Sequence, residues 1–144
     1  MIAHIYTDGS FKKHTIGWSF VVVEGDDIIH QANGIIDNPD PALLKTRNIA
    51  GELRAAMQAI GWAIENKYQK VVIHHDYTGV AYWVTGHWKA RNMYTKQYVK
   101  WVSKAKIEII FEHIKGHTGN QYNEIADQLA KDAIDQMKGK TDDN

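Results

Sequence analysis

The chain is best understood from one short segment, His4-Ile5-Tyr6-Thr7-Asp8-Gly9-Ser10. Ile, Tyr and Thr favour extended backbone, and the Gly-Ser pair ends the run with turn-forming residues. Asp8 therefore stands at the end of a strand, and no Lys or Arg lies next to it in the sequence. A carboxylate in that position is suited to bind a cation together with other acids.

The apolar pattern around this segment predicts an α/β protein. Strands are expected at 4–10, 15–24, 28–36, 71–73 and 107–114, and helices at 48–66, 77–85, 94–104 and 121–137. Residues 37–41 contain two prolines and are expected to form a loop. The first three strands follow one another through short connections and should be antiparallel, whereas helices precede the last two strands, which should be parallel additions. We expect one domain over residues 1–137, a mixed five-stranded sheet flanked by helices, and a polar tail at 138–144.

Composition excludes several classes of protein. The 144 residues are 44% hydrophobic and 24% charged, which is typical of a soluble globular protein. No apolar run approaches the roughly 20 residues that span a bilayer, so no membrane association is expected. The absence of cysteine excludes disulfides and thiolate metal sites, and it favours a cytoplasmic location. Lys plus Arg and Asp plus Glu balance at 17 each, which is unusual for a nucleic-acid binder unless bound divalent cations reverse the local charge.

Three further acids stand where the predicted elements would return them to Asp8. Asp76 directly follows the apolar run of the fourth strand, and Glu52 and Asp127 border the apolar stripes of their helices. Any one of them, taken alone, is more simply explained as a helix cap or a solvated side chain. Four acids at one sheet end, without a basic partner in the sequence, would repel one another strongly. Hard divalent cations such as Mg²⁺ or Mn²⁺ would relieve that repulsion.

Four segments resemble, in family order, the motifs of type 1 ribonuclease H, also called ribonuclease HI. They are Tyr6-Thr7-Asp8-Gly9-Ser10, Asn48-Ile49-Ala50-Gly51-Glu52-Leu53, His75-Asp76-Tyr77, and Lys115-Gly116-His117-Thr118-Gly119-Asn120 continued through Asn123-Glu124-Ile125-Ala126-Asp127. The resemblance covers residues 2–133. It implies a ribonuclease H-like fold and a monomeric endonuclease that hydrolyses the RNA strand of RNA/DNA hybrids. The implied products carry 5′-phosphate and 3′-hydroxyl ends, and the implied mechanism uses two metal ions.

The resemblance also assigns roles to individual residues. Asp8, Glu52, Asp76 and Asp127 would hold two Mg²⁺ ions, with Mn²⁺ as a substitute, and His117 would move protons or assist product release. The implied substrate contacts are Gly9, Ser10, Arg47, Asn48, Thr78, Trp88 and Asn123. Arg47 stands where many relatives have a threonine that meets a DNA phosphate. Asn48 and Asn120 are equally suited to cap helices, and Asn123 to lie on the surface.

One feature departs from the family pattern, and another could be confused with a zinc-binding motif. The segment Gly86 to Arg91 is short and lacks the Lys-rich protrusion with which some relatives grip the hybrid. Trp83, Trp88, Lys89 and Arg91 remain for that purpose, although Trp83 is equally suited to the core, and hybrid binding should be weak and salt-sensitive. His74 and His75 are adjacent on a strand and point to opposite faces, so they should not share a zinc ion.

Other functions are compatible with parts of this pattern. A junction-resolving or transposase-like enzyme would use the same fold but needs additional DNA-binding elements or a dimer interface. A catalytically silent nucleic-acid-binding module would lack one of the acids, and all four are present. A ribonuclease H domain derived from a reverse transcriptase would share the chemistry and rely on neighbouring domains for its grip.

Overall fold

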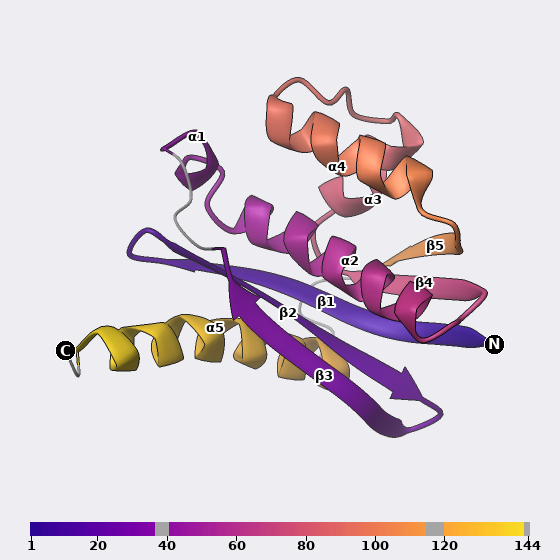
Figure 1. Ribbon diagram of the computed structural model, residues 1–144, viewed down its shortest axis with the longest axis horizontal. Coiled ribbons are helices and arrows are strands. Elements are labelled where there is room, and N and C mark those ends of the chain that lie inside the picture. The colour runs from indigo at the N-terminus through magenta and orange to yellow at the C-terminus, as the bar shows by residue number, and fades with distance from the viewer. Residues whose placement is uncertain (37–40, 115–119, 143–144) are drawn as a thin grey trace.

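The computed structural model describes residues 1–36, 41–114 and 120–142, with side chains up to residue 137. The elements in chain order are β1 (Ile2–Lys12), β2 (Thr15–Glu24), β3 (Asp27–Ile35), α1 (Pro41–Leu44), α2 (Asn48–Glu65), β4 (Lys70–His75), α3 (Gly79–Thr85), α4 (Met93–Lys104), β5 (Glu108–His113) and α5 (Gln121–Asp142). They form three layers: α2, α3 and α4 lie on one side of a central sheet and α5 lies on the other (Figure 1).

The sheet has the predicted mixed topology. Its strand order is β3-β2-β1-β4-β5, in which β1, β2 and β3 are antiparallel neighbours and β1, β4 and β5 are parallel neighbours. In the register between β1 and β4, Tyr6 lies opposite His74. Asp8 and Asp76 each follow two residues later, so the parallel pairing directs both acids to the same end of the sheet.

The main core lies between the sheet and α2. Ile5 and Ile73 from the sheet and Leu53 and Ile60 from α2 are fully buried there, as the helical spacing of the apolar residues predicts. Tyr98 of α4 is also fully buried, and its hydroxyl donates a hydrogen bond to the Val80 carbonyl at 2.6 Å. A smaller cluster forms where Val21, Val23 and Ala126 meet beneath α5.

Three glycines bring both helix layers close to the strand that carries Asp8. A Cβ atom on Gly9 would overlap the backbone of α2 at Gly51 and Glu52, and one on Gly51 would overlap the carbonyl oxygen of Gly17 in β2. From the opposite side, the Ala130 carbonyl of α5 approaches Gly17 in the same way. Hence α2 and α5 approach the β1–β2 pair from opposite faces, close to Asp8.

The structure differs from the predictions mainly at element ends. Residues 41–44 form the short helix α1, although the sequence predicts a loop that includes Pro41 and no helix before residue 48; Pro41 occupies the first position of α1, where the missing N–H of proline is no disadvantage. Helix α5 continues to Asp142, beyond the predicted end at residue 137. None of the helices in the described ranges is long and apolar enough to cross a bilayer.

Candidate active site

Asp8 and Glu52 are buried acids that meet where β1 contacts α2. Asp8 is 6% exposed and Glu52 is 3% exposed. The backbone N–H of Gly9 donates to Asp8 Oδ1 at 2.9 Å, which fixes one carboxylate oxygen at the strand end. Glu52 Oε2 is buried and has no hydrogen-bond partner among the described residues. An unpartnered buried carboxylate oxygen is costly, so this atom is available to a ligand.

The electrostatics of this pair favour protonated carboxyl groups. Burial, together with the negative charge of Asp127, raises the pKa of Asp8 from 3.8 to about 6. Burial is also the largest cause of the raised pKa of Glu52, followed by the charges of Asp8 and, more weakly, Asp76. The four predicted acids therefore influence one another, because Asp8 responds to Asp127 and Glu52 responds to both Asp8 and Asp76.

Asp76 and Asp127 complete the acidic cluster from more exposed positions. Asp76 is exposed and directly follows β4, and its backbone carbonyl accepts a hydrogen bond from His113 Nε2 at 2.8 Å. Asp127 lies in α5 and follows Ala126, whose carbonyl accepts a hydrogen bond from Ser19 of β2 at 2.5 Å. That bond ties this turn of α5 to the sheet beside Asp8.

One of the four acids has a basic partner, contrary to the expectation from the sequence. Lys131 Nζ lies 2.9 Å from Asp127 Oδ2, in an i,i+4 pair along α5. The hydrogen bond and charge of Asp127, with a further contribution from Asp8, raise the pKa of Lys131. The i,i+4 spacing is the signal in the sequence that could have revealed this pair.

The donor set suits a hard divalent cation, although the side chains do not yet form a closed site. Among the described residues, no group of three or more His, Cys, Asp or Glu side chains is placed to hold a metal ion. The chemistry nevertheless fits, because carboxylate oxygens are the ligands that Mg²⁺ or Mn²⁺ prefers, and two of the four acids, Asp8 and Glu52, are buried with raised pKa values. To contribute fully, Asp127 would have to exchange Lys131 for the ion.

The predicted substrate contacts surround this cluster unevenly. Gly9 is buried against α2, and Ser10 is half-buried one residue further along β1. Arg47 and Asn48 are exposed at the start of α2, and Arg47 has the unusual backbone angles φ 53° and ψ −128°. Because Arg47 occupies the N-cap position, Asn48 is the first helical residue and does not cap α2.

The two asparagines near the start of α5, Asn120 and Asn123, differ in their contacts. Asn120 caps α5, since its Oδ1 accepts hydrogen bonds from the backbone of Tyr122 and Asn123, each at 3.0 Å. Asn123 lies one turn before Asp127 and is half-buried, and its own Oδ1 is buried without a partner in the part of the chain that the structure describes. Asn123 is therefore not simply a surface residue, because part of its side chain is buried. His117 lies outside the described residues.

An aromatic cluster occupies the region where some relatives carry the protrusion. Only seven residues, 86–92, connect α3 to α4. Trp83 packs against the core, while Trp88 is 38% exposed and contacts Trp83, Tyr77 and Tyr82 in edge-on geometry. Thr78, at the start of α3, is half-buried. Lys89 and Arg91 are exposed.

The adjacent histidines point to opposite faces, as predicted. His75 is buried, and its Nδ1 lies 3.0 Å from the Tyr77 carbonyl; burial lowers its pKa to about 4, so it is the neutral ring that donates. His74 instead stacks on Tyr6 at 4.3 Å. His113 and His75 bond to the backbone carbonyls of Asp76 and Tyr77 respectively, a role in positioning the chain at Asp76 that the sequence did not reveal.

Comparison with known proteins gives a consistent result. A family model described as RNase H matches residues 2–135. The chain is 34% identical to a ribonuclease H from Caulobacter sp. strain K31, covering 88% of this chain and 86% of that protein. It is 32% identical to a ribonuclease HI from Caulobacter vibrioides, covering 92% of both chains.

Solved structures match the fold over nearly the whole chain. The RNase H1 of the halophilic archaeon Halobacterium salinarum NRC-1 superimposes with a TM-score of 0.79 at 21% identity, covering 94% of this chain and 99% of the other. LC11-RNase H1, solved in complex with an RNA/DNA hybrid, gives a TM-score of 0.76 at 20% identity, covering 94% of this chain and 98% of the other.

Proposed function

This chain belongs to the ribonuclease H family of nucleases, and we propose that it hydrolyses the RNA strand of RNA/DNA hybrids with divalent cations bound by Asp8, Glu52, Asp76 and Asp127. The observation that carries the proposal is the buried pair of Asp8 and Glu52, whose pKa values are both raised and whose free oxygen, Glu52 Oε2, lacks a partner. A pair of buried acids that only stabilised the fold would be expected to have compensating donors.

The four acids divide the work by position. Asp8 is central because it contacts Glu52, and because the negative charge of Asp127 raises its pKa. Asp8 would therefore hold a cation together with either neighbour. Bound Mg²⁺ or Mn²⁺ ions would supply Lewis acidity at the phosphate and at the attacking and departing oxygens. Glu52 and Asp8 would have to lose their protons to bind them, which makes cation binding and proton release one event.

The RNA strand would be distinguished from DNA by its 2′-hydroxyls. Backbone groups at Gly9 and Ser10 and the amides of Asn48 and Asn123 can both donate to and accept from a hydroxyl. The unpartnered Oδ1 of Asn123 supports that role for this residue. Arg47 and Trp88 are exposed and available for phosphate contact and stacking respectively. We also propose that the enzyme acts as a monomer in the cytoplasm.

A strand-specific cleavage assay tests this function. A hybrid is labelled on its RNA strand or on its DNA strand and incubated with Mg²⁺, Mn²⁺ or EDTA, and duplex DNA and a four-way junction are treated in parallel. We expect internal cuts in the RNA strand alone, with 5′-phosphate and 3′-hydroxyl ends, and none in EDTA. Cleavage of the junction or duplex DNA in preference to the hybrid would favour the alternative nucleases on this fold.

A further inference from the structure

A polar pocket lies beside the acidic cluster, between the end of β1 and α5. It has a volume of about 270 Å³ and is lined by Ser10, Phe11, Lys12, Gln128, Lys131, Ile134 and Asp135. Figure 1 shows the C-terminal half of α5 running alongside the β1–β2 hairpin. None of the four acids lines it, so it is a separate space next to the proposed metal site.

The spacing of β1 matches that of α5 along this contact. Residues two apart on a strand lie on one face about 6.7 Å apart. Residues four apart on a helix lie on one face about 6 Å apart. The two elements therefore present three successive levels: Asp8 with Asp127, Ser10 with Lys131, and Lys12 with Asp135. The first level is acidic, and the next two supply a hydroxyl, two ammonium groups and the carboxylate of Asp135.

Both ammonium groups are held in place by exchangeable ion pairs. Lys131 pairs with Asp127 at 2.9 Å, and Lys12 pairs with Asp135 at 3.7 Å. All four side chains are about half exposed, so the pairs are weak and can open at little cost. A cation bound by Asp127 would displace Lys131, whose nearest open space is the pocket that it already lines.

We propose that Ser10, Lys12 and Lys131 form a phosphate subsite for the RNA strand, adjacent to the phosphate that is cut. This inference rests on the proposed function, because Lys131 becomes available when divalent cations occupy the acids. In the metal-free protein Lys131 neutralises Asp127, and in the loaded protein it binds a phosphodiester instead. The subsite gives a chain of zero net charge a local grip on the strand that it cuts.

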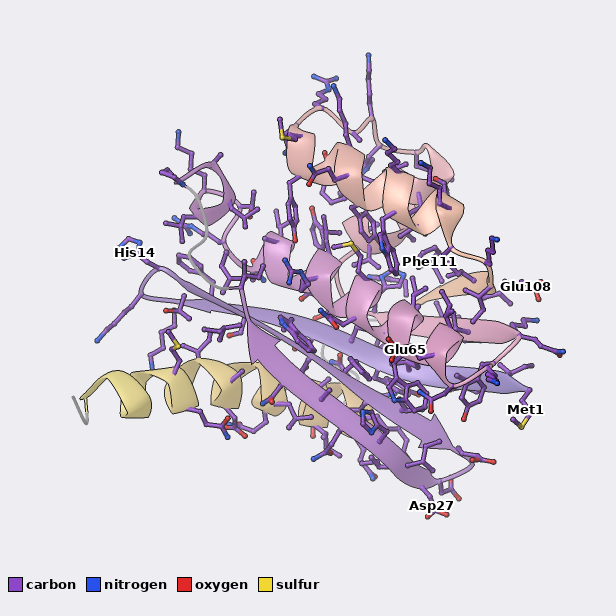
Figure 2. All side chains as sticks on the ribbon, viewed as in Figure 1. Met1, His14, Asp27, Glu65, Glu108 and Phe111 are labelled. Carbon is purple, nitrogen blue, oxygen red and sulfur yellow. The ribbon has the colours of Figure 1, made fainter. Side chains whose placement is uncertain are left out.

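The test compares Lys12→Gln and Lys131→Gln, singly and together, with the control Lys106→Gln, which removes one positive charge as each single variant does. Lys106 is exposed and precedes β5, whose first residue Glu108 lies at the opposite end of the sheet from the β1–β2 turn at His14 (Figure 2). Steady-state cleavage of a hybrid in Mg²⁺ is measured over a range of salt. We expect the double variant to raise KM about 10-fold at low salt with kcat within about threefold, and to reduce the slope of log KM against log salt by about 1 to 2. Lys106→Gln should leave KM within about twofold of wild type.

A second experiment measures Mg²⁺ binding without substrate. Mg²⁺ is titrated into each protein without nucleic acid, and binding is followed by the increase in the thermal unfolding temperature. Lys131→Gln should bind Mg²⁺ several-fold more tightly than wild type because the competitor of the ion at Asp127 is gone, whereas Lys12→Gln should bind it as wild type does. An unchanged KM and salt slope in the double variant would overturn the subsite, and an unchanged Mg²⁺ affinity in Lys131→Gln would overturn the exchange. Failure of the wild type to cleave hybrid would instead refute the proposed function.

Discussion

Asp8 and Glu52 are the residues on which the proposed ion site depends, and their burial is unfavourable when no ion is bound. Their carboxyl groups are almost fully buried, and the pKa values of both are raised. At neutral pH the protein must either retain protons on the pair or bury charge that nothing balances. In either protonation state, binding of a cation would reduce the cost of burying the two acids. Asp8 is the more informative of the two residues, because its charge can be removed with little change of shape.

Asp8→Asn should abolish cleavage and leave hybrid binding within a few-fold of wild type. Asparagine keeps an oxygen for the Gly9 N–H but cannot serve as a charged ligand. Cleavage is measured with labelled hybrid in Mg²⁺, and binding by fluorescence anisotropy in EDTA. Wild-type turnover in a variant shown by circular dichroism to be folded would remove Asp8 from the chemistry.

Asp8→Asn should also stabilise the metal-free protein in a pH-dependent way. The pKa of Asp8 is raised to about 6 in the folded state, so the folded protein binds more protons than the unfolded chain between about pH 4 and 6. Stability from this group is therefore lost as the pH rises through that window. We expect the variant to gain about 2 kcal/mol over wild type by pH 7 and little at pH 4.

The difference between the two proteins is the quantity to measure, by urea unfolding in EDTA. His75 has a pKa lowered to about 4, so it destabilises the folded state on acidification and opposes the effect of Asp8 in wild type. Because His75 is present in both proteins, its contribution cancels in the difference. If the difference in stability does not grow with pH, burial of the ionised Asp8 carboxylate does not destabilise the folded protein.

His117→Ala should slow turnover by about 10- to 10³-fold without abolishing it, which is the low-to-middle part of the range for proton-transfer groups. His117 lies outside the described residues, so this prediction comes from the resemblance of its motif. The measurement is single-turnover cleavage across pH. A rate equal to wild type at every pH would refute the role.

At the level of elements, close backbone contact positions the acids. Gly51 has no side chain, and the space that a Cβ atom would fill is occupied by the carbonyl oxygen of Gly17 and the Cα of Gly9. Helix α2 therefore lies close to β1 and β2 at the position from which the Glu52 side chain extends toward Asp8. Loss of that contact should displace Glu52 even though the acid itself is unchanged.

Gly51→Ala tests this contact, with Gly61→Ala as a control in the same helix. A Cβ on Gly51 would overlap backbone atoms that cannot rotate away, so we expect a loss of about 2 kcal/mol of stability and a fall in kcat. A Cβ on Gly61 meets nothing within 4 Å, so the control should gain about 0.5–1 kcal/mol from helix propensity. Chemical denaturation and cleavage rates measure both effects. Equal stability of the two variants would show that the close contact is unimportant.

The sequence predicted these elements well where periodicity is strong and less well where contacts between elements decide. Strand β2 occupies Thr15–Glu24 as predicted, because its β-branched and aromatic run is bounded by turn residues on both sides. Helix α1 was missed because two prolines were interpreted as a loop, although Pro41 favours a helix start. The overlap between Gly51 and Gly17 depends on tertiary packing, which no local pattern encodes. For the same reason, burial of Asp8 and Glu52 and their altered pKa values could not be predicted from spacing alone.

For the whole molecule, the central question is how a protein of zero net charge handles a polyanion. The connection between α3 and α4 is short, so the affinity for a hybrid should be modest and should fall steeply with salt. Bound cations would reverse the sign of the acidic cluster, and Lys12 and Lys131 would extend the positive region along the strand. Under the proposed function, cleavage therefore depends on cation binding, and substrate affinity increases with it.

Calorimetric titration of Mg²⁺ or Mn²⁺ into the metal-free protein near pH 6.5 tests that step most directly. Wild type should bind the ion saturably and release protons on binding, detected as a heat that depends on the ionisation enthalpy of the buffer, because Asp8 and Glu52 must ionise. Asp8→Asn should lose most of the binding and most of the proton release. Binding of equal strength in the two proteins, or none in wild type, would contradict a cation site built on these acids.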